Sequence, residues 1–447
     1  MNIQSFNIAG RLCSTNDLKN IVSQVNTPYF IIYLKEGISW VHYAQERMLQ
    51  IIADTDAAMV YSDRFQEKNG NIINAPVIDY QQGSLRDDFD FGSVLMINTN
   101  LAKQVLLQTQ HQYQYAALYD LRLKLSQKGQ ITHISEYLYY EKELDLRTSG
   151  EKLFDYVDPK NRTVQVEMEQ AVTEHLKEVN AYLPPKHKTV DLTADDFQYE
   201  ASVVIPCKNR VRTIASAIRS ALSQQVNEPY KYNVIVVDDN STDGTVEAIK
   251  EILNEGHPNL IYIPQDTTYH AIGGNWNAAL HHPLCGRFAL QLDSDDTYSD
   301  THTVQRFIDA FHREQCAMVI GSYQLTDFNG NTLPPGIIDH REWTDNNGHN
   351  NALRINGLGA PRGFFTPLLR QWNFPTTKYG EDYAVGLRVC REYRIGRIYD
   401  VMYNCRRWED NSDANVDIEG MNRNNLYKDS IRTWELKARQ SLNNTKP

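Results

Sequence analysis

Hydrophobic and polar positions follow a regular pattern in the second half of the chain. After about residue 200, short apolar runs alternate with stretches whose apolar residues recur at helical spacing. The pattern predicts strands at 202–206, 233–237, 260–263 and 288–292, and helices at 212–225, 242–254 and around 304–311. Strands that alternate with amphipathic helices are typical of a mostly parallel sheet. Ligands bind such sheets at the carboxyl ends of the strands.

The N-terminal half contains a partial internal repeat. Residues 58–62 (AMVYS) resemble 317–321 (AMVIG), and each stretch is followed by an Asn-Gly-Asn triplet. Further on, Tyr119-Asp120 resembles Glu381-Asp382. We therefore predict a truncated, degenerate copy of the later fold. Residues 161–183 carry apolar side chains at helical spacing and precede two prolines, so we expect a linking helix there.

Composition narrows the class of protein. The chain has 447 residues, of which 41% are hydrophobic and 23% charged, which is enough for a packed core. Its net charge of −11 disfavours a nucleic-acid binder. Because we find no secretory pattern and no apolar run of about 20 residues, we expect a cytoplasmic protein without a transmembrane segment. The six cysteines form no CxxC pair, which predicts separate reduced thiols.

Three acidic clusters carry the candidate chemistry. Asp238 and Asp239 follow the apolar strand at 233–237, where a carboxylate can accept hydrogen bonds from a base or a ribose. The alternative is a helix-capping cluster. Residues 293–296 (DSDD) follow the strand at 288–292, and their mutual repulsion favours a bound Mn²⁺ or Mg²⁺. The alternative here is a solvated turn.

The third cluster is Glu381-Asp382, at the start of a predicted helix. Near a metal, one of these carboxylates could act as a general base, although acidic residues also stabilise helix N-termini without any catalytic role. Arg406, Arg407 and Trp408 form a fourth candidate, because arginines pair with phosphates and an indole ring can face a sugar or base. A solvated polar loop is the alternative.

The ordered set of motifs over residues 198–410 resembles family 2 glycosyltransferases of the GT-A fold. The first strand at 202–206, Asp238-Asp239 at a strand tip, the DxD-type motif at 293–296 and the Gly380-Glu381-Asp382 motif occur in the family's order. The resemblance implies an α/β, Rossmann-like, mostly parallel sheet flanked by helices, with a smaller α/β module before it. The domains we expect are a degenerate GT-A-like module (1–150), a linking helix and connector (151–197), a catalytic domain (198–410) and a helical tail (411–447).

The resemblance also implies an inverting transfer from a nucleotide-diphosphate sugar, most often UDP-linked, to a hydroxyl acceptor. Asp295 and Asp293 would hold Mn²⁺ or Mg²⁺, and Asp382, beside Glu381, would be the base. The residues expected to contact the nucleotide sugar are Pro206, Asp238, Asp239, Asn277, Asp293, Arg406, Arg407 and Trp408.

Two departures from the family pattern affect the expected role. Cys207-Lys208-Asn209 replaces a usual Tyr-Asn pair, and residues 404–408 (NCRRW) only approximate the QxxRW motif of processive members. We expect a non-processive enzyme of bacterial surface polysaccharide or glycolipid assembly, with a glycan or glycolipid acceptor and possible peripheral membrane association. The alternatives are an inactive sugar-nucleotide-binding or scaffold protein and a sugar nucleotidyltransferase. The N-terminal module is expected to be structural or to face the acceptor.

Overall fold

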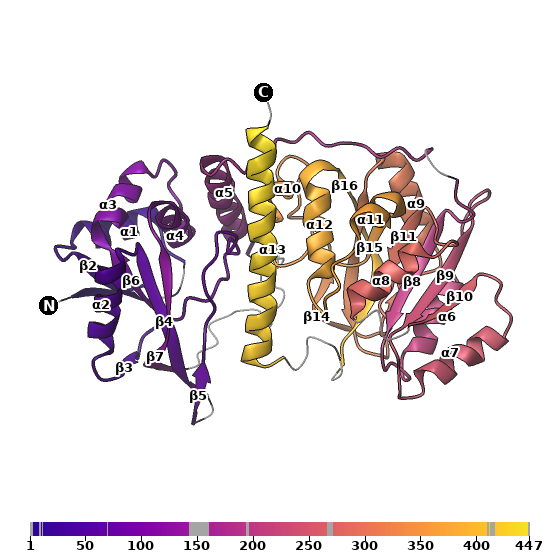
Figure 1. The fold of residues 1–447 in the computed structure, drawn as a ribbon, viewed down its shortest axis with the longest axis horizontal. Coiled ribbons are helices and arrows are strands. Elements are labelled where there is room, and N and C mark those ends of the chain that lie inside the picture. Colours follow the sequence, from indigo (N-terminus) through magenta and orange to yellow (C-terminus); the bar gives the residue numbers. More distant parts are fainter. Residues whose placement is uncertain are drawn as a thin grey trace. The chain divides into compact units, whose positions relative to one another are not determined.

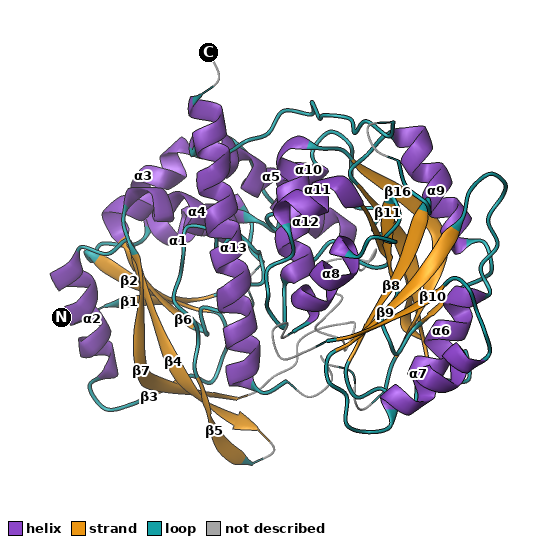
Figure 2. Cartoon of the chain, turned by 45° about the vertical axis from the view of Figure 1, so that its right-hand side comes forward, coloured by secondary structure: helices purple, strands orange, loops and turns teal. Residues whose placement is uncertain are grey.

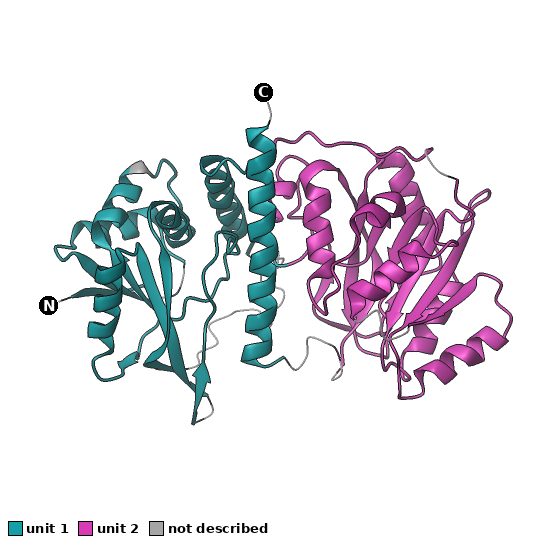
Figure 3. Cartoon of the chain, in the orientation of Figure 1, with its two compact units in different colours: residues 1–183, 353–356, 416–447 teal, residues 184–352, 357–415 magenta. Residues whose placement is uncertain are grey.

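The computed structural model describes residues 3–8, 10, 12–68, 70–142, 161–193, 196–265, 271–408, 411 and 416–445. The chain forms two compact units, coloured separately in Figure 3. Unit 1 comprises residues 1–183, 353–356 and 416–447, and unit 2 comprises residues 184–352 and 357–415. Among the described residues, no helix has the length and apolar character needed to span a membrane.

Unit 2 is built on a nine-stranded mixed sheet of order β10-β9-β8-β11-β15-β13-β16-β12, in which β14 pairs with β13. Its strands are β8 (Ala201–Cys207), β9 (Tyr232–Asp238), β10 (Leu260–Pro264), β11 (Phe288–Gln291), β12 (Thr297–Tyr298), β13 (Met318–Thr326), β14 (Thr332–Ile338), β15 (Arg362–Phe365) and β16 (Ile395–Arg406). Its helices are α6 (Ile214–Leu222), α7 (Thr245–Asn254), α8 (Ile272–His281), α9 (Thr303–Glu314), α10 (Gly348–Asn351), α11 (Thr366–Trp372) and α12 (Glu381–Glu392). The strands from β10 to β11 are parallel, and β15 runs antiparallel to both of its neighbours.

The sequence pattern of unit 2 is explained by burial on both faces of this sheet. Every residue of β8 is buried, as is nearly every residue of β9, because helices cover both sides. Figure 2 shows α6 and α9 on one side of the sheet and α8, α11 and α12 on the other. The predicted strands and helices of this region are confirmed, with shorter helices than expected at α6 and α7.

Unit 1 contains a seven-stranded sheet of order β1-β2-β6-β4-β7-β3, in which β5 pairs with β4 (Figure 1). Its strands are β1 (Gln4–Asn7), β2 (Tyr29–Tyr33), β3 (Ser39–Trp40), β4 (Met59–Lys68), β5 (Asn71–Ala75), β6 (Val94–Asn98) and β7 (Ile131–Lys142). Its helices are α1 (Thr15–Ser23), α2 (Ala44–Thr55), α3 (Thr99–Gln108), α4 (Ala117–Lys128), α5 (Arg162–Glu178) and α13 (Ile418–Asn444). The helix expected in 161–183 is therefore present and belongs to unit 1.

The sheet of unit 1 has the same strand order and directions as β8-β11-β15-β13-β16-β12 of unit 2. The parallel pairs β1–β2 and β4–β7 correspond to β8–β11 and β13–β16, and β6 corresponds to the antiparallel strand β15. Met59 pairs with Ile131 and Ile97, as Met318 pairs with Ile395 and Phe364. Unit 1 has no counterpart of α6, β9, α7 and β10 among its described residues. The duplication of one ancestral fold stays a prediction.

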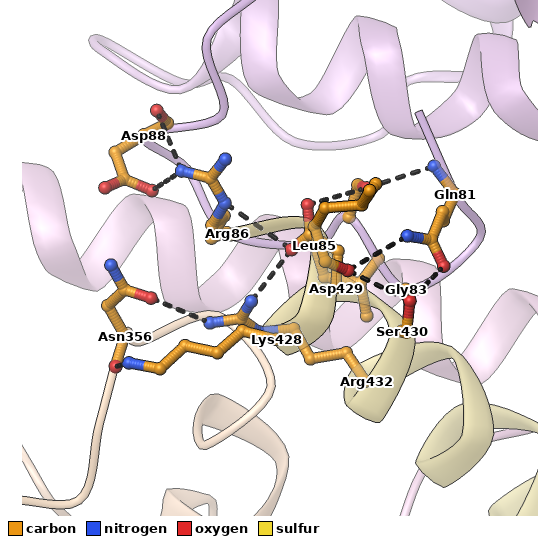
Figure 4. Close-up of polar contacts among 12 residues, drawn as sticks. Gln81, Gly83, Leu85, Arg86, Asp88, Asn356, Lys428, Asp429, Ser430 and Arg432 are labelled. Atoms are coloured by element: carbon orange, nitrogen blue, oxygen red, sulfur yellow. Dashed lines mark hydrogen bonds and ion pairs between the residues drawn. The ribbon is translucent and has the colours of Figure 1, made fainter. Parts of the chain in front are cut away.

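A buried ionic cluster holds the long C-terminal helix α13 within unit 1 (Figure 4). The carboxylate of Asp429 accepts hydrogen bonds from Arg432 Nη1 at 2.8 Å and Ser84 Oγ at 3.0 Å, and it lies 3.4 Å from Arg86 Nε. Arg432 Nη2 also donates to the Ile355 carbonyl at 3.0 Å. Because Asp429 and Arg432 are fully buried, each charge depends on the other for compensation.

Candidate active site

Two of the three acidic clusters of unit 2 lie at the ends of strands of its central sheet, and the third begins a helix. Asp238 ends β9, Asp293 and Asp295 follow β11, and Glu381 and Asp382 begin α12. The ends of β9 and β11 lie at the same edge of the sheet, since both strands are parallel to β8 between them.

Asp239 presents a buried oxygen without a donor. Its side chain is almost fully buried, Oδ2 lies 3.2 Å from Lys208 Nζ, and Oδ1 has no hydrogen-bond partner among the described residues. A buried acceptor without a donor costs about 1–3 kcal/mol, so an N–H group of a ligand would be stabilising there. Asp238, by contrast, accepts from the backbone N–H of Ser241 at 3.2 Å and the thiol of Cys207 at 3.7 Å, so it holds the loop.

The cluster after β11 is crowded with negative charge. Burial raises the pKa of Asp293 and, further, that of Asp296, and the neighbouring Asp295 charge adds to both shifts. From the described residues, Asp295 Oδ2 accepts two long hydrogen bonds, each of 3.3 Å, from the Trp408 and Asn411 side chains. Among the described residues, no group of three or more His, Cys, Asp or Glu is arranged to hold a metal ion.

The loop after β8 supplies a cation to each of two acidic clusters. Lys208 pairs with Asp239, and Arg210 Nε lies 3.8 Å from Asp295 Oδ2. The loop is fixed because the backbone N–H of Arg210 donates to Thr245 Oγ1 at 2.7 Å. Asp239 and Asp295 are therefore connected through a single short segment.

Arg362 connects the second cluster to the third. Its Nε donates to Gln291 Oε1 at 3.0 Å, and Gln291 Nε2 donates to both carboxylate oxygens of Asp293 at 3.0 Å. Its Nη1 donates to Asp382 Oδ2. Asp293 and Asp382 are thus joined by a continuous chain of hydrogen bonds at the end of β11.

Glu381 and Asp382 lie in different environments. Burial, followed by the neighbouring charge of Asp382, raises the pKa of Glu381 to about 8. The Asp382 side chain is 28% exposed and is paired with Arg362. Near neutral pH, Glu381 is therefore mostly protonated, and Asp382 is the member of the pair that a substrate can reach.

The structure gives Arg406, Arg407 and Trp408 different positions. Arg406 is buried: its Nε donates to the Asp295 carbonyl at 2.5 Å and its backbone N–H donates to Asp296 Oδ1 at 2.7 Å. The Trp408 ring lies under the Arg212 guanidinium at 4.9 Å. For Arg407, the backbone N–H donates to the Thr326 carbonyl at 2.8 Å. Arg406 and Trp408 therefore contact the acidic cluster directly.

Asn277 and Pro206 have structural roles in the protein as it stands. Asn277 Nδ2 donates to the Phe374 carbonyl at 2.9 Å, and its Oδ1 accepts from the Phe374 N–H at 2.7 Å. Pro206 is a buried residue of β8 opposite Val237. Their contact with a nucleotide sugar stays a prediction.

Sequence reasoning missed Gln291, Arg362 and Tyr403. The Tyr403 hydroxyl accepts a hydrogen bond from the Asp293 N–H at 2.9 Å. A polar side chain within or beside a buried apolar strand was the available signal, since such a side chain needs a partner.

Unit 2 has the mixed α/β sheet with flanking helices expected of a GT-A domain. Residues 202–373 match the family described as Glycosyl transferase family 2. These residues are therefore similar to a family 2 glycosyltransferase domain. The match runs from β8 to the end of α11, so that α12 and β16 lie outside it.

A chondroitin synthase of Escherichia coli is 31% identical over 137 residues, which are 30% of this chain and 19% of that protein. The chain thus spans about a fifth of the length of this relative. Among solved structures, S. aureus TarS in complex with UDP is 21% identical with a TM-score of 0.40, covering 52% of this chain and 65% of that chain. Mannosyltransferase PcManGT from Pyrobaculum calidifontis, in complex with GDP-Man and Mn²⁺, is 15% identical with a TM-score of 0.37. The match covers 62% of this chain and 86% of that chain.

Proposed function

We propose that unit 2 transfers a sugar from a nucleotide-diphosphate sugar to a hydroxyl group of a glycan or glycolipid. The observation that carries this proposal is that Lys208 and Arg210 of one loop lie beside Asp239 and Asp295. In the same unit, Arg362 joins Asp382 through Gln291 to Asp293. The match to a chondroitin synthase supports a glycan acceptor. The donor is expected to be UDP-linked.

The nucleotide would lie over the ends of β8 and β9. Asp239 Oδ1, which has no donor of its own, would accept an N–H of the base. Lys208 and Arg210 would face the diphosphate, because each already lies beside a carboxylate of this edge. Ligand phosphates would then compete with these carboxylates for the two cations.

The residues of the second cluster fit a divalent cation only in part. Asp295 and Asp293 would supply two carboxylates, and the long hydrogen bonds at Asp295 leave its oxygens weakly satisfied. Burial, and after it the neighbouring charge of Asp295, raises the pKa values of Asp293 and Asp296, so a bound cation would favour the ionised form of both groups. Asp293 and Asp295 would hold Mn²⁺ or Mg²⁺, and the positive charge that such an ion supplies would offset the charge of the leaving group.

Asp382 would remove the proton from the acceptor hydroxyl. It is the more exposed member of its pair, and the raised pKa of Glu381, about 8, means that Glu381 adds little competing negative charge near neutral pH. Arg362 would fix the orientation of the carboxylate through Nη1. A single displacement with one base inverts the anomeric centre and needs no covalent intermediate.

Release of nucleotide tests the proposal. The intact protein is incubated with a panel of UDP- and GDP-sugars, Mn²⁺ and candidate glycan acceptors, and free nucleotide diphosphate and glycan product are measured. We expect product from at least one donor and a loss of transfer activity of at least a hundredfold in Asp382→Asn. The control is Asp345→Asn on the surface of unit 2, where the side chain is 72% exposed, and its transfer activity should not change. Donor binding without product from any donor would indicate an inactive binding protein. Equal turnover in Asp382→Asn would exclude Asp382 as the base.

A further inference from the structure

Unit 1 contains a pocket at the end of its sheet that corresponds to the substrate edge of unit 2. The pocket has a volume of about 330 Å³, within the range of small-ligand sites. It is lined by Asn7, Tyr33, Lys35, Glu36, Gly37, Ile38, Trp40 and Gln45. Asn7 and Tyr33 end the parallel strands β1 and β2, and most of the other lining residues follow β2 directly.

Strand register shows which residues replace the acidic cluster. Phe30 pairs with Ile97 as Ala289 pairs with Phe364, so residues after β2 can be matched to those after β11. By this match, Leu34, Glu36 and Gly37 occupy the positions of Asp293, Asp295 and Asp296. Two of the three carboxylates are therefore missing from this pocket.

The general base is missing as well. Helices α4 and α12 have the same length and lead into the corresponding strands β7 and β16 after the same short connection. Their bounds place Ala117 and Leu118 at the positions of Glu381 and Asp382, two residues before the Tyr119-Asp120 pair suggested by sequence similarity. The pocket therefore lacks the groups that transfer chemistry needs.

The groups that the pocket does contain suit a sugar ring. Trp40 Nε1 donates to the Tyr33 hydroxyl at 3.0 Å, and the Trp40 ring packs edge-on against Tyr33 and Tyr139 with centroid distances of 6.2 and 6.1 Å. The Trp40 side chain, partly buried against the core, lines the pocket with an apolar aromatic group, and Asn7 and Gln45 line it with amide donors and acceptors.

The charges of the pocket disfavour a phosphate ligand. Lys35 Nζ lies 3.0 Å from the fully buried carboxylate of Glu141, so its charge is already compensated within the protein. Glu36 is exposed at the pocket and adds a negative charge. Unit 1 also has no described counterpart of β9, the strand that carries Asp238 and Asp239 in unit 2. Among the described residues that line the pocket, a nucleotide would find neither a base site nor a free cation.

We propose that this pocket of unit 1 is a non-catalytic binding site for a neutral sugar residue of a glycan chain. The site rests on unit 1 alone. Its use for an acceptor or product chain of the same enzyme rests, in addition, on the function proposed for unit 2.

Binding to the intact protein, without donor or metal, tests the site. The protein is screened on an array of neutral and acidic oligosaccharides, and the tightest neutral oligosaccharide is then titrated by calorimetry. We expect Trp40→Ala to weaken binding at least tenfold, while Trp434→Ala, on the 59% exposed tryptophan of α13 in the same unit, leaves it unchanged. Asn7→Ala changes an exposed residue at the end of β1, so it tests the pocket even if Trp40→Ala is poorly folded by circular dichroism.

UDP and inorganic phosphate serve as competitors in the same titration. We expect neither to displace the oligosaccharide. The inference is overturned if no neutral oligosaccharide binds, if Trp40→Ala and Asn7→Ala both bind like the parent, or if UDP competes. Glycan binding that depends on Trp40 in a protein that turns over no nucleotide sugar would support this site and contradict the function proposed for unit 2. Turnover of a nucleotide sugar without Trp40-dependent glycan binding would support the function proposed for unit 2 and contradict this site.

Discussion

Arg362→Ala is the most informative change in unit 2, because this arginine joins two acidic clusters. Its side chain is 13% exposed and donates hydrogen bonds to Gln291 and Asp382. Removal would take the Arg362 charge away from Asp382 and would increase the repulsion between the carboxylates of Asp382 and Asp293, both of which stabilise the guanidinium.

Loss of one partner of a buried ion pair costs about 3–5 kcal/mol. Since Asp382 is 28% exposed, water screens part of the loss, and we expect a value near the lower end, about 3 kcal/mol. For a domain of this size that is a fall of about 6–12 °C in melting temperature. Arg362→Lys should recover part of the loss, since an ammonium keeps the charge but not the planar fork of donors.

Differential scanning calorimetry measures the shift, with Arg219→Ala as a control in the same unit. Arg219 forms a surface pair with Glu255 and should contribute little. The reasoning is refuted if Arg362→Ala has the same melting temperature as the Arg219→Ala control. Transfer activity should also fall in Arg362→Ala at temperatures where the variant is folded, because Asp382 loses its positioning partner.

Three further predictions follow from the same contacts. The raised pKa of Glu381 means that the contribution of Glu381 to stability is complete below about pH 4.5 and is lost as the pH rises through about 8. Between about pH 5 and 9, the melting temperature of Glu381→Gln should therefore fall less than that of the parent protein. Parallel curves of melting temperature against pH would contradict this. Asp239→Ala should weaken UDP binding about tenfold (~1.4 kcal/mol) in a calorimetric titration, whereas unchanged affinity would remove Asp239 from the base site. Asp429→Ala leaves two buried arginines without their shared anion, so the free energy of unfolding of unit 1, measured by chemical denaturation, should fall by about 3–5 kcal/mol. A fall below about 1 kcal/mol would show that water replaces the carboxylate.

The sheet of unit 2 could be predicted because its strands are buried on both faces. Runs such as 203–205 and 234–237 have no polar residue that a different register could expose. Helix ends were less accurate. The helix expected from residue 242 begins at Thr245, because Asp243 accepts hydrogen bonds from the backbone N–H groups of Val211 and Thr245 and so holds a loop before the helix.

The position of the acidic residues could be predicted, but their partners could not. Arg362 lies 71 residues from Gln291 in the sequence, and no local pattern relates the two. The same holds for Asp429 and Ser84, which are 345 residues apart. The sequence match of residues 58–62 to 317–321 is in register in the structure, since the two segments form the corresponding strands β4 and β13. The match of Tyr119-Asp120 to Glu381-Asp382 is displaced by two residues.

Calorimetric titration of UDP with and without Mn²⁺, in the parent and in Asp295→Ala, tests the central claim most directly. The claim is that carboxylates at the strand ends of unit 2 hold a cation against a diphosphate. We predict that Mn²⁺ strengthens UDP binding to the parent at least tenfold and has no such effect on Asp295→Ala. Equal enhancement by Mn²⁺ in both proteins, or absence of UDP binding to the folded parent, would contradict the account.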